Sequence, residues 1–157
     1  MSRRACDSAR RAGRAGACHH WRVSWDIFIQ NLPAGAGSVQ DIPDDFRPGP
    51  IGRRSDLIRA IAEVVPSADF SDPSWGIIGG DGFSIEVSMG SDEIVDCIAL
   101  FVRGSDIAAG VVADIVGRLG LRALDAGTGD FFNPATAAGS LRKWWAYRDR
   151  VTGQPGR

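Results

Sequence analysis

Six acidic residues in the middle of the chain carry the groups that could do chemistry. They are Asp69, Asp72, Asp81, Asp92, Glu93 and Asp96. Carboxylate oxygens bind hard cations such as Ca²⁺, and two carboxylates in different environments can divide acid and base roles. The six residues do not follow the spacing of a calcium-binding loop. Glu86 with Asp96 would be a pair for a two-carboxylate mechanism, but nothing in the sequence singles that pair out. We therefore predict no metal site and leave the catalytic residues unassigned.

Histidine is missing from the part of the chain that is expected to fold. Both histidines, His19 and His20, precede Val23, and residues 23–157 hold one cysteine, Cys97. Ser-His-Asp and Cys-His catalysis need an imidazole within hydrogen-bond reach, and nitrogen-ligated metal sites need one too. These chemistries are excluded, so the sequence favours a protein that is not an enzyme and uses no cofactor.

The residues expected to bind a partner lie in loops beside predicted strands. They are Asp72, Trp75, Asp81, Asp92, Glu93 and Asp96. Residues 70–76 (FSDPSWG) join two aromatic rings to an Asp-Pro turn, a composition that suits a recognition loop. The acidic members would form a charged rim for a partner, although solvation alone also explains acidic loops.

Charge divides the chain into two parts. Residues 1–22 contain six arginines and one acid, whereas residues 23–157 contain 12 basic and 18 acidic residues, a net charge of −6. Such a domain needs a concentrated basic patch to bind phosphate groups, and Arg53-Arg54 with Arg142-Lys143 are too few. The sequence therefore disfavours nucleic acid and favours a basic protein as the partner.

The basic leader, residues 1–22, shows no apolar periodicity and is not expected to join the fold. It lacks the apolar stretch of a secretory signal, and an organellar transit peptide is the alternative. Strand-like alternation starts abruptly after Val23, and valine is how a GTG start codon reads when it is translated internally. We expect the native chain to begin there, to form one domain over residues 23–151, and to fray over residues 152–157. Cys6 and Cys18 with the two histidines match no zinc-finger spacing.

Hydrophobic periodicity predicts the elements that position these loops. Strands are expected at residues 25–31, 94–102 and 121–125 and as a hairpin over 74–89, with helices at 53–65, 105–119 and 141–151. Residues 32–52, rich in Pro and Gly, are expected to form a long ordered loop. The order β-loop-α-β-β-β-α-β-α predicts an α+β fold, a single domain with a mainly antiparallel sheet and two or three helices packed on one face.

Local signals refine these elements. Ser105 is the predicted N-cap and Gly120 the predicted C-terminal stop of the second helix. The pair Phe131-Phe132 is expected to close the edge of the core. Neighbours on a helix point about 100° apart, so Trp144 and Trp145 cannot both face the core, and one of them should be partly exposed.

The apolar runs and the cysteines indicate the cellular compartment in which the protein is expected. The longest apolar runs, such as residues 98–102, are far shorter than the roughly 20 residues that cross a bilayer. Three cysteines form no even, regularly spaced set of the kind that disulfide scaffolds use. We therefore expect a soluble, cytoplasmic protein with no membrane partner.

Three segments resemble small bacterial proteins of unknown function. These segments are SWDIF at residues 24–28, DIPDDF at 41–46 and FSDPSWG at 70–76. The resemblance spans most of residues 24–151. It implies a bacterial, cytoplasmic protein and brings no activity with it.

Two function classes remain, with a third possibility for assembly. The first is a small noncatalytic protein-interaction module, comparable to immunity proteins and antitoxins, whose acidic surface covers a basic partner. The alternative is a small-molecule or metal-binding protein, or an enzyme, that uses the carboxylate-lined loops around a pocket. A homo-oligomer joined through Trp75, Phe131 or Trp144 is the third.

Overall fold

The computed structural model describes residues 24–153. The predictions made for the basic leader, for its cysteines and histidines, and for the end of the tail beyond Gly153 lie outside the described residues.

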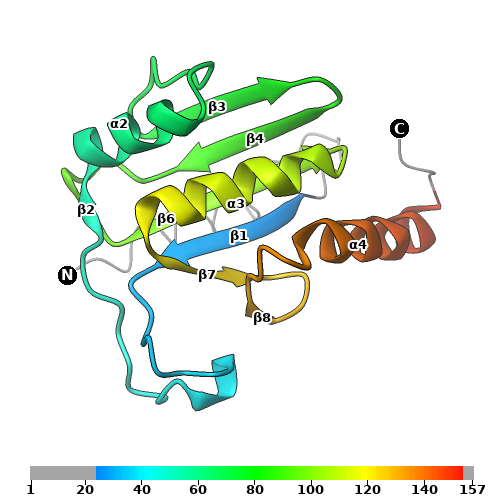
Figure 1. Cartoon of the computed structure of the whole chain (residues 1–157), viewed down its shortest axis with the longest axis horizontal. Helices are drawn as coiled ribbons and strands as arrows, with labels where there is room; N and C mark the ends of the chain where they lie inside the picture. Colours follow the sequence, from blue (N-terminus) through cyan, green and yellow to red (C-terminus); the bar gives the residue numbers. More distant parts are fainter. Residues whose placement is uncertain (1–23, 154–157) are drawn as a thin grey trace.

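A six-stranded antiparallel sheet with strand order β3-β4-β6-β1-β7-β8 forms the centre of this part of the chain (Figure 1). Its strands are β1 (Trp25–Gln30), β3 (Trp75–Gly80), β4 (Phe83–Ser88), β6 (Cys97–Gly104), β7 (Arg122–Asp125) and β8 (Asp130–Phe131). The other elements are a 3-10 helix η1 (Val39–Asp41), the two-stranded pair β2 (Gly52–Arg53) and β5 (Ile94–Val95), and the helices α2 (Arg54–Val64), α3 (Ile107–Leu119) and α4 (Ala137–Thr152). The predicted α+β class with a mainly antiparallel sheet is confirmed.

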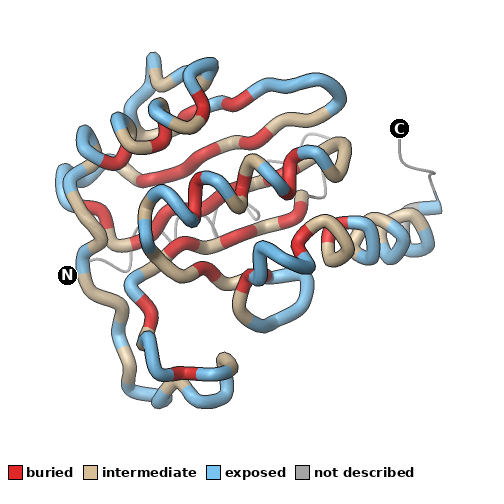
Figure 2. Tube along the Cα trace, viewed as in Figure 1, coloured by how far each residue is buried: buried red, intermediate tan, exposed pale blue. Residues whose placement is uncertain are grey.

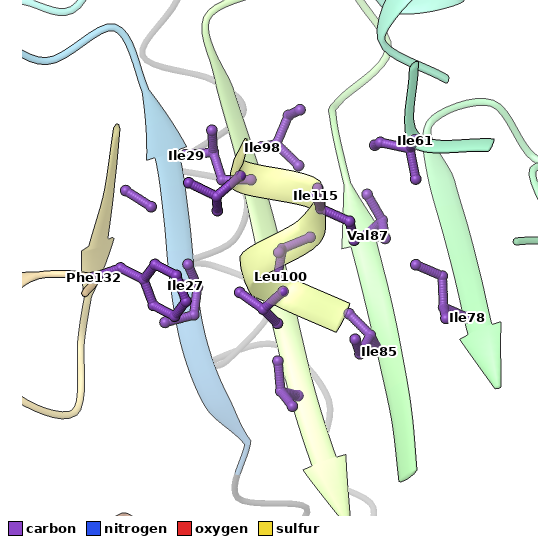
Figure 3. Close-up of a cluster of buried hydrophobic side chains, with 14 of the residues drawn as sticks. Ile27, Ile29, Ile61, Ile78, Ile85, Val87, Ile98, Leu100, Ile115 and Phe132 are labelled. Atoms are coloured by element: carbon purple, nitrogen blue, oxygen red, sulfur yellow. The ribbon is translucent and has the colours of Figure 1, made fainter. Parts of the chain in front are cut away.

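The hydrophobic core lies on one face of the sheet, and all three described helices contribute to it. Alternate residues of the strands point to this face, as Figure 3 shows for Ile27, Ile85 and Leu100. Ile61 of α2, Ile115 of α3 and Leu141 of α4 are fully buried in the same cluster. Burying side chains of this size stabilises a fold by about 1.5–3 kcal/mol each. The alternating burial is visible along the strands in Figure 2.

The run from Ile94 to Val102, predicted as one strand, is divided between two sheets. Residues 94–95 form β5, which pairs with β2 through the partners Gly52–Val95 and Arg53–Ile94. After Asp96 the chain enters the main sheet as β6, between β4 and β1. The prediction of one continuous strand was wrong because β2, a two-residue strand inside a Pro-rich loop, left no periodic signal.

The long loop at residues 32–52 is held by specific contacts. The Arg122 guanidinium donates to the carbonyl oxygens of Pro33 and Ala36. The Val39 amide donates to an Asp130 carboxylate oxygen at 3.1 Å. The loop is therefore tied to β7 and β8, as an ordered loop should be.

The caps of α3 agree with the prediction at one end only. Gly120 ends the helix at φ 64°, the left-handed conformation that favours glycine. At the other end Asp106, not Ser105, is the N-cap. Ser105 instead offers its backbone carbonyl to the Ala108 amide, and its hydroxyl has no hydrogen-bond partner within the described residues. The N-cap prediction was wrong because the helix begins one residue later than the apolar stripe indicated.

The β3–β4 hairpin turns at Asp81 and Gly82, because Gly80 and Phe83 are still paired. Gly82 takes φ 75°. Gly104, at φ 97°, approaches this turn so closely that an added Cβ would lie 2.2 Å from the Gly82 carbonyl oxygen. The Gly-rich turn was predicted correctly, although Gly79 and Gly80 belong to the strand.

The turn after β7, on which α4 packs, is held by a buried polar contact. The Trp25 indole N–H donates to Asp125 at 2.7 Å, and the same carboxylate accepts from the Gly127 amide at 2.8 Å. A Cβ on Gly127 would lie 2.9 Å from Cδ1 of Trp144. Both Trp144 and Trp145 are half-buried against the core, so the helix sits at its edge.

None of the helices within residues 24–153 is long and apolar enough to span a membrane.

Candidate functional site: the open face of the sheet

The second face of the sheet carries no helix within residues 24–153, and we call it the open face in that sense only, because Ser88, Cys97 and Ala99 on it are buried and Cys97 is disulfide-bonded. Side chains that point to it come from the alternate positions of each strand. One row of paired residues crosses all six strands: Trp75, Ser88, Ala99, Phe28, Leu124 and Phe131. Four of its six side chains are aromatic or large and aliphatic, and each of these four is half-buried. An apolar row on a sheet face without helices is a feature of binding surfaces.

Aromatic stacking defines the β3 end of this row. The rings of Trp75 and Phe101 lie 5.8 Å apart between centroids, with an interplanar angle of 20°. The two residues sit on strands separated by β4, so the contact bridges the small side chain of Ser88. Ile77, the next outward-facing residue of β3, is 51% exposed. Trp75 and Ile77 together offer apolar surface on β3, an edge strand of the sheet.

Three charged residues form the neighbouring group on the open face. The Arg103 guanidinium of β6 forms an ion pair with the Glu86 carboxylate of β4, with 3.1 Å between Nη1 and Oε2. Asp26 of β1 also feels the charge of Arg103 and accepts a hydrogen bond from the Ser24 hydroxyl. The Nε of Arg103 is buried without a hydrogen-bond partner within the described residues. The group holds two carboxylates and one guanidinium, which leaves it net negative when all three are ionised.

Burial raises the pKa of the Asp26 carboxyl, and the Ser24 hydrogen bond and Arg103 offset only part of this effect. A carboxylate that is costly to ionise gains when a cation approaches it. Asp26 is therefore suited to meet a basic group of a partner.

A second arginine closes the opposite end of the row. The guanidinium of Arg122 lies 3.7 Å from the centroid of the Phe131 ring, a cation–π geometry. Phe132, the next residue, points to the core side and lies 6.1 Å from Trp25 between ring centroids. Only Phe132 therefore closes the core, whereas Phe131 belongs to the open face.

Of the residues predicted to bind a partner, Trp75 lies on the open face and the acids lie in loops. Asp72 lies three residues before the start of β3 and is exposed. Asp92 and Glu93 lie in the exposed loop before β5, where Glu93 pairs with Arg53 at 3.0 Å, and Asp96 separates β5 from β6. All of these lie toward the end of the sheet where β3 begins, at the left in Figure 1.

Asp81 is separated from the other predicted residues. It sits in the hairpin turn just beyond Gly80, which is roughly 17 Å along β3 from Trp75 at about 3.3 Å per residue. Within residues 24–153, no group of three or more His, Cys, Asp or Glu side chains is arranged to hold a metal ion. The structure thus does not bring the six residues together.

Two of the acidic residues are engaged in local turns. Hydrogen bonds from the Ser71 hydroxyl and amide lower the pKa of Asp69. The Ser74 hydroxyl, at 2.7 Å, and the Ser74 amide, at 2.9 Å, do the same for the pKa of Asp72. Both carboxylates therefore shape the loop that leads into Trp75.

Sequence analysis missed Phe101, Arg103 and Asp26 as members of this site. Phe101 lies in an apolar run that predicted burial on both faces, and Asp26 appeared only as a polar alternate of β1. The signal was present in the alternation, since both residues occupy positions opposite to the core. What it lacked was the register that pairs Asp26 with Phe101 and Phe101 with Glu86.

Comparison of the chain with protein-family models, with curated proteins and with solved structures gives no match.

Proposed function

We propose that this domain is a noncatalytic protein-interaction module whose basic partner docks on the open face. The observation that carries the proposal is the apolar row with the Trp75–Phe101 stack, on a face without a described helix. Stacked aromatic side chains supply large contact areas at small entropic cost and are typical anchors of protein interfaces.

Charge beside the row supports a basic partner. On the face itself Asp26 and Glu86 are matched by Arg103 and Arg122, and the acidic excess comes from Asp69 and Asp72 in the exposed loop that leads to Trp75. A cationic side chain of the partner that approached Asp26 would compensate the ionisation of Asp26. The lack of histidine in residues 23–157 supports a noncatalytic role.

The test is affinity capture with matched variants. The tagged full-length chain is incubated with a lysate of its native source, and bound proteins are identified by mass spectrometry at low and high salt. We expect a basic protein that high salt releases. Trp75→Ala should reduce its capture by about ten-fold or more, as loss of an interface tryptophan commonly does.

Ile77→Ser and Ile107→Ser provide a matched pair for the same experiment. Ile77 is 51% exposed on the open face, and Ile107 is 60% exposed at the start of α3. Because both sites are exposed, neither change should unfold the domain. Capture should fall for Ile77→Ser and stay unchanged for Ile107→Ser. Failure to capture a basic protein, or an equal loss with both variants, would overturn the proposal.

A further inference from the structure

The last helix differs in charge from the rest of the described chain. Residues 24–136 contain 7 basic and 17 acidic residues, a net charge of −10, whereas α4 contains four basic residues and one acidic residue, a net charge of +3. These cations are too few to predict binding of nucleic acid. Opposite net charges within one chain favour contact between copies.

The second half of α4 extends away from the sheet (Figure 1). Only Ala137 and Leu141 of the helix are members of the buried core, and both belong to its first half. Beyond Trp145 the helix carries Tyr147, which is 61% exposed, and Val151, which is 66% exposed. Large apolar side chains that a helix exposes to water form a surface that could contact another molecule.

These apolar side chains share one face of the helix with two cations. Lys143, Tyr147, Arg150 and Val151 follow the spacing i, i+4, i+7, i+8, which places them on the same side. All four are exposed, and neither Lys143 nor Arg150 forms an ion pair within the described residues. We call these four residues the α4 patch. Its two cations are about 10.5 Å apart along the helix axis.

A net negative surface lies at β5, where Asp92, Glu93 and Asp96 outnumber Arg53, which pairs across the strands with Ile94 and with Glu93 at 3.0 Å. Ile94 is 46% exposed, one of the five large apolar residues exposed in the described chain. Asp92 and Asp96 flank it two residues away on either side, and their Cα atoms are at most about 14 Å apart. We call these three residues the β5 patch. Each patch has apolar surface between two like charges at comparable spacing.

We propose that the α4 patch of one copy docks on the β5 patch of a second copy. Lys143 and Arg150 then meet Asp92 and Asp96, while Tyr147 and Val151 cover Ile94. The two patches lie at opposite sides of the molecule in Figure 1, because β5 pairs with β2 on the left and α4 extends to the right. The contact is therefore head-to-tail, a geometry that adds further copies unless the ring closes.

The first test is the mass of the purified full-length chain in solution. Sedimentation at low salt should show a mass above the 16.7 kDa of one chain that rises as the concentration approaches about 1 mM. About 0.5 M salt should reduce the association. A mass of one chain throughout this range would overturn the proposal.

Charge reversal separates the two halves of the contact. Lys143→Glu/Arg150→Glu removes the α4 patch and keeps the β5 patch, and Asp92→Lys/Asp96→Lys does the opposite. Each variant alone should associate at least about ten-fold more weakly than the natural chain. Mixed together, they should associate again, because the two intact patches can pair with each other and the two reversed patches also carry opposite charges. A mixture that stays monomeric would contradict the pairing of these two patches.

A matched control changes the same charge elsewhere. Arg47→Glu/Arg59→Glu also reverses two exposed cations, one in the long loop and one on α2, and should keep the association. Equal weakening by this control would mean that net charge alone drives association and would overturn the proposal. Because the assays use the purified chain alone, their result is independent of capture of a partner by the open face.

Discussion

Asp26 shows how burial of one carboxyl on the open face bears on stability. Its carboxyl is half-buried on β1 beside Arg103, and burial raises its pKa despite the Ser24 hydrogen bond. A raised carboxyl pKa means that the folded state binds the proton more tightly than the unfolded state. The corresponding stability is fully present below the unfolded pKa and is lost as pH rises through the folded pKa.

Replacing this carboxyl should therefore stabilise the domain at neutral pH. Asp26→Asn removes the cost of ionisation, so its midpoint of urea unfolding at pH 7 should exceed that of the natural chain. The advantage should shrink as pH falls through the raised folded pKa toward about 3.9, and it should be absent below the unfolded pKa, where the carboxyl is protonated in both states. Urea titrations from pH 3 to pH 8 test this, with Asp114→Asn, an exposed change on α3, as the control. A variant that is less stable than the natural chain at pH 7 would show that the ion pair outweighs the burial cost.

Single residues of the site were predictable only where their own type was informative. Trp75 was selected because a tryptophan beside an Asp-Pro turn suits recognition. Phe101 and Asp26 could not be selected, because their role depends on partners 26 and 77 residues away. Those contacts follow from strand register, which alternation alone does not determine.

At the scale of elements, α3 offers a paired test of backbone conformation. Gly110 lies in an exposed helical position where an added Cβ would meet nothing within 4 Å, and Gly120 ends the helix at φ 64°. Gly110→Ala should stabilise the domain by about 0.5–1 kcal/mol because alanine loses less backbone entropy. Gly120→Ala should destabilise it by about 1 kcal/mol because alanine is strained in the left-handed region. Urea unfolding measures both, and effects of the same sign would contradict this account of the cap.

Elements with a long periodic pattern were predicted well, and short ones were not. The stripe of α3 and the alternation of β4 have enough residues to define a period. β2, β5 and β8 contain two residues each, too few for any period, and they exist because distant backbone groups pair with them. Tertiary pairing therefore explains why one predicted strand became β5 and β6.

At the scale of the whole molecule, one hydrophobic core joins an acidic body, residues 24–136, to a basic helix, α4. The core joins α2, α3, α4 and the sheet into a single cluster on one face, while the open face and the outer half of α4 stay outside it. Sequence analysis recognised the acidic domain but not the basic helix within it, because the net charge was summed over both.

A shared core predicts that the domain unfolds in one step. Leu141 of α4 is fully buried in the same cluster as Ile61 of α2. Leu141→Ala should cost about 2–5 kcal/mol and lower a single urea midpoint. That midpoint should be the same by far-UV circular dichroism and by NMR signals of β4, at the opposite side of the sheet from α4. Val151→Ala, a 66% exposed change on the same helix, should leave the midpoint of a dilute sample unchanged. If helical signal were lost before the β4 signals in Leu141→Ala, α4 would be a separate unit, and its charge could not be treated as fixed relative to the acidic body.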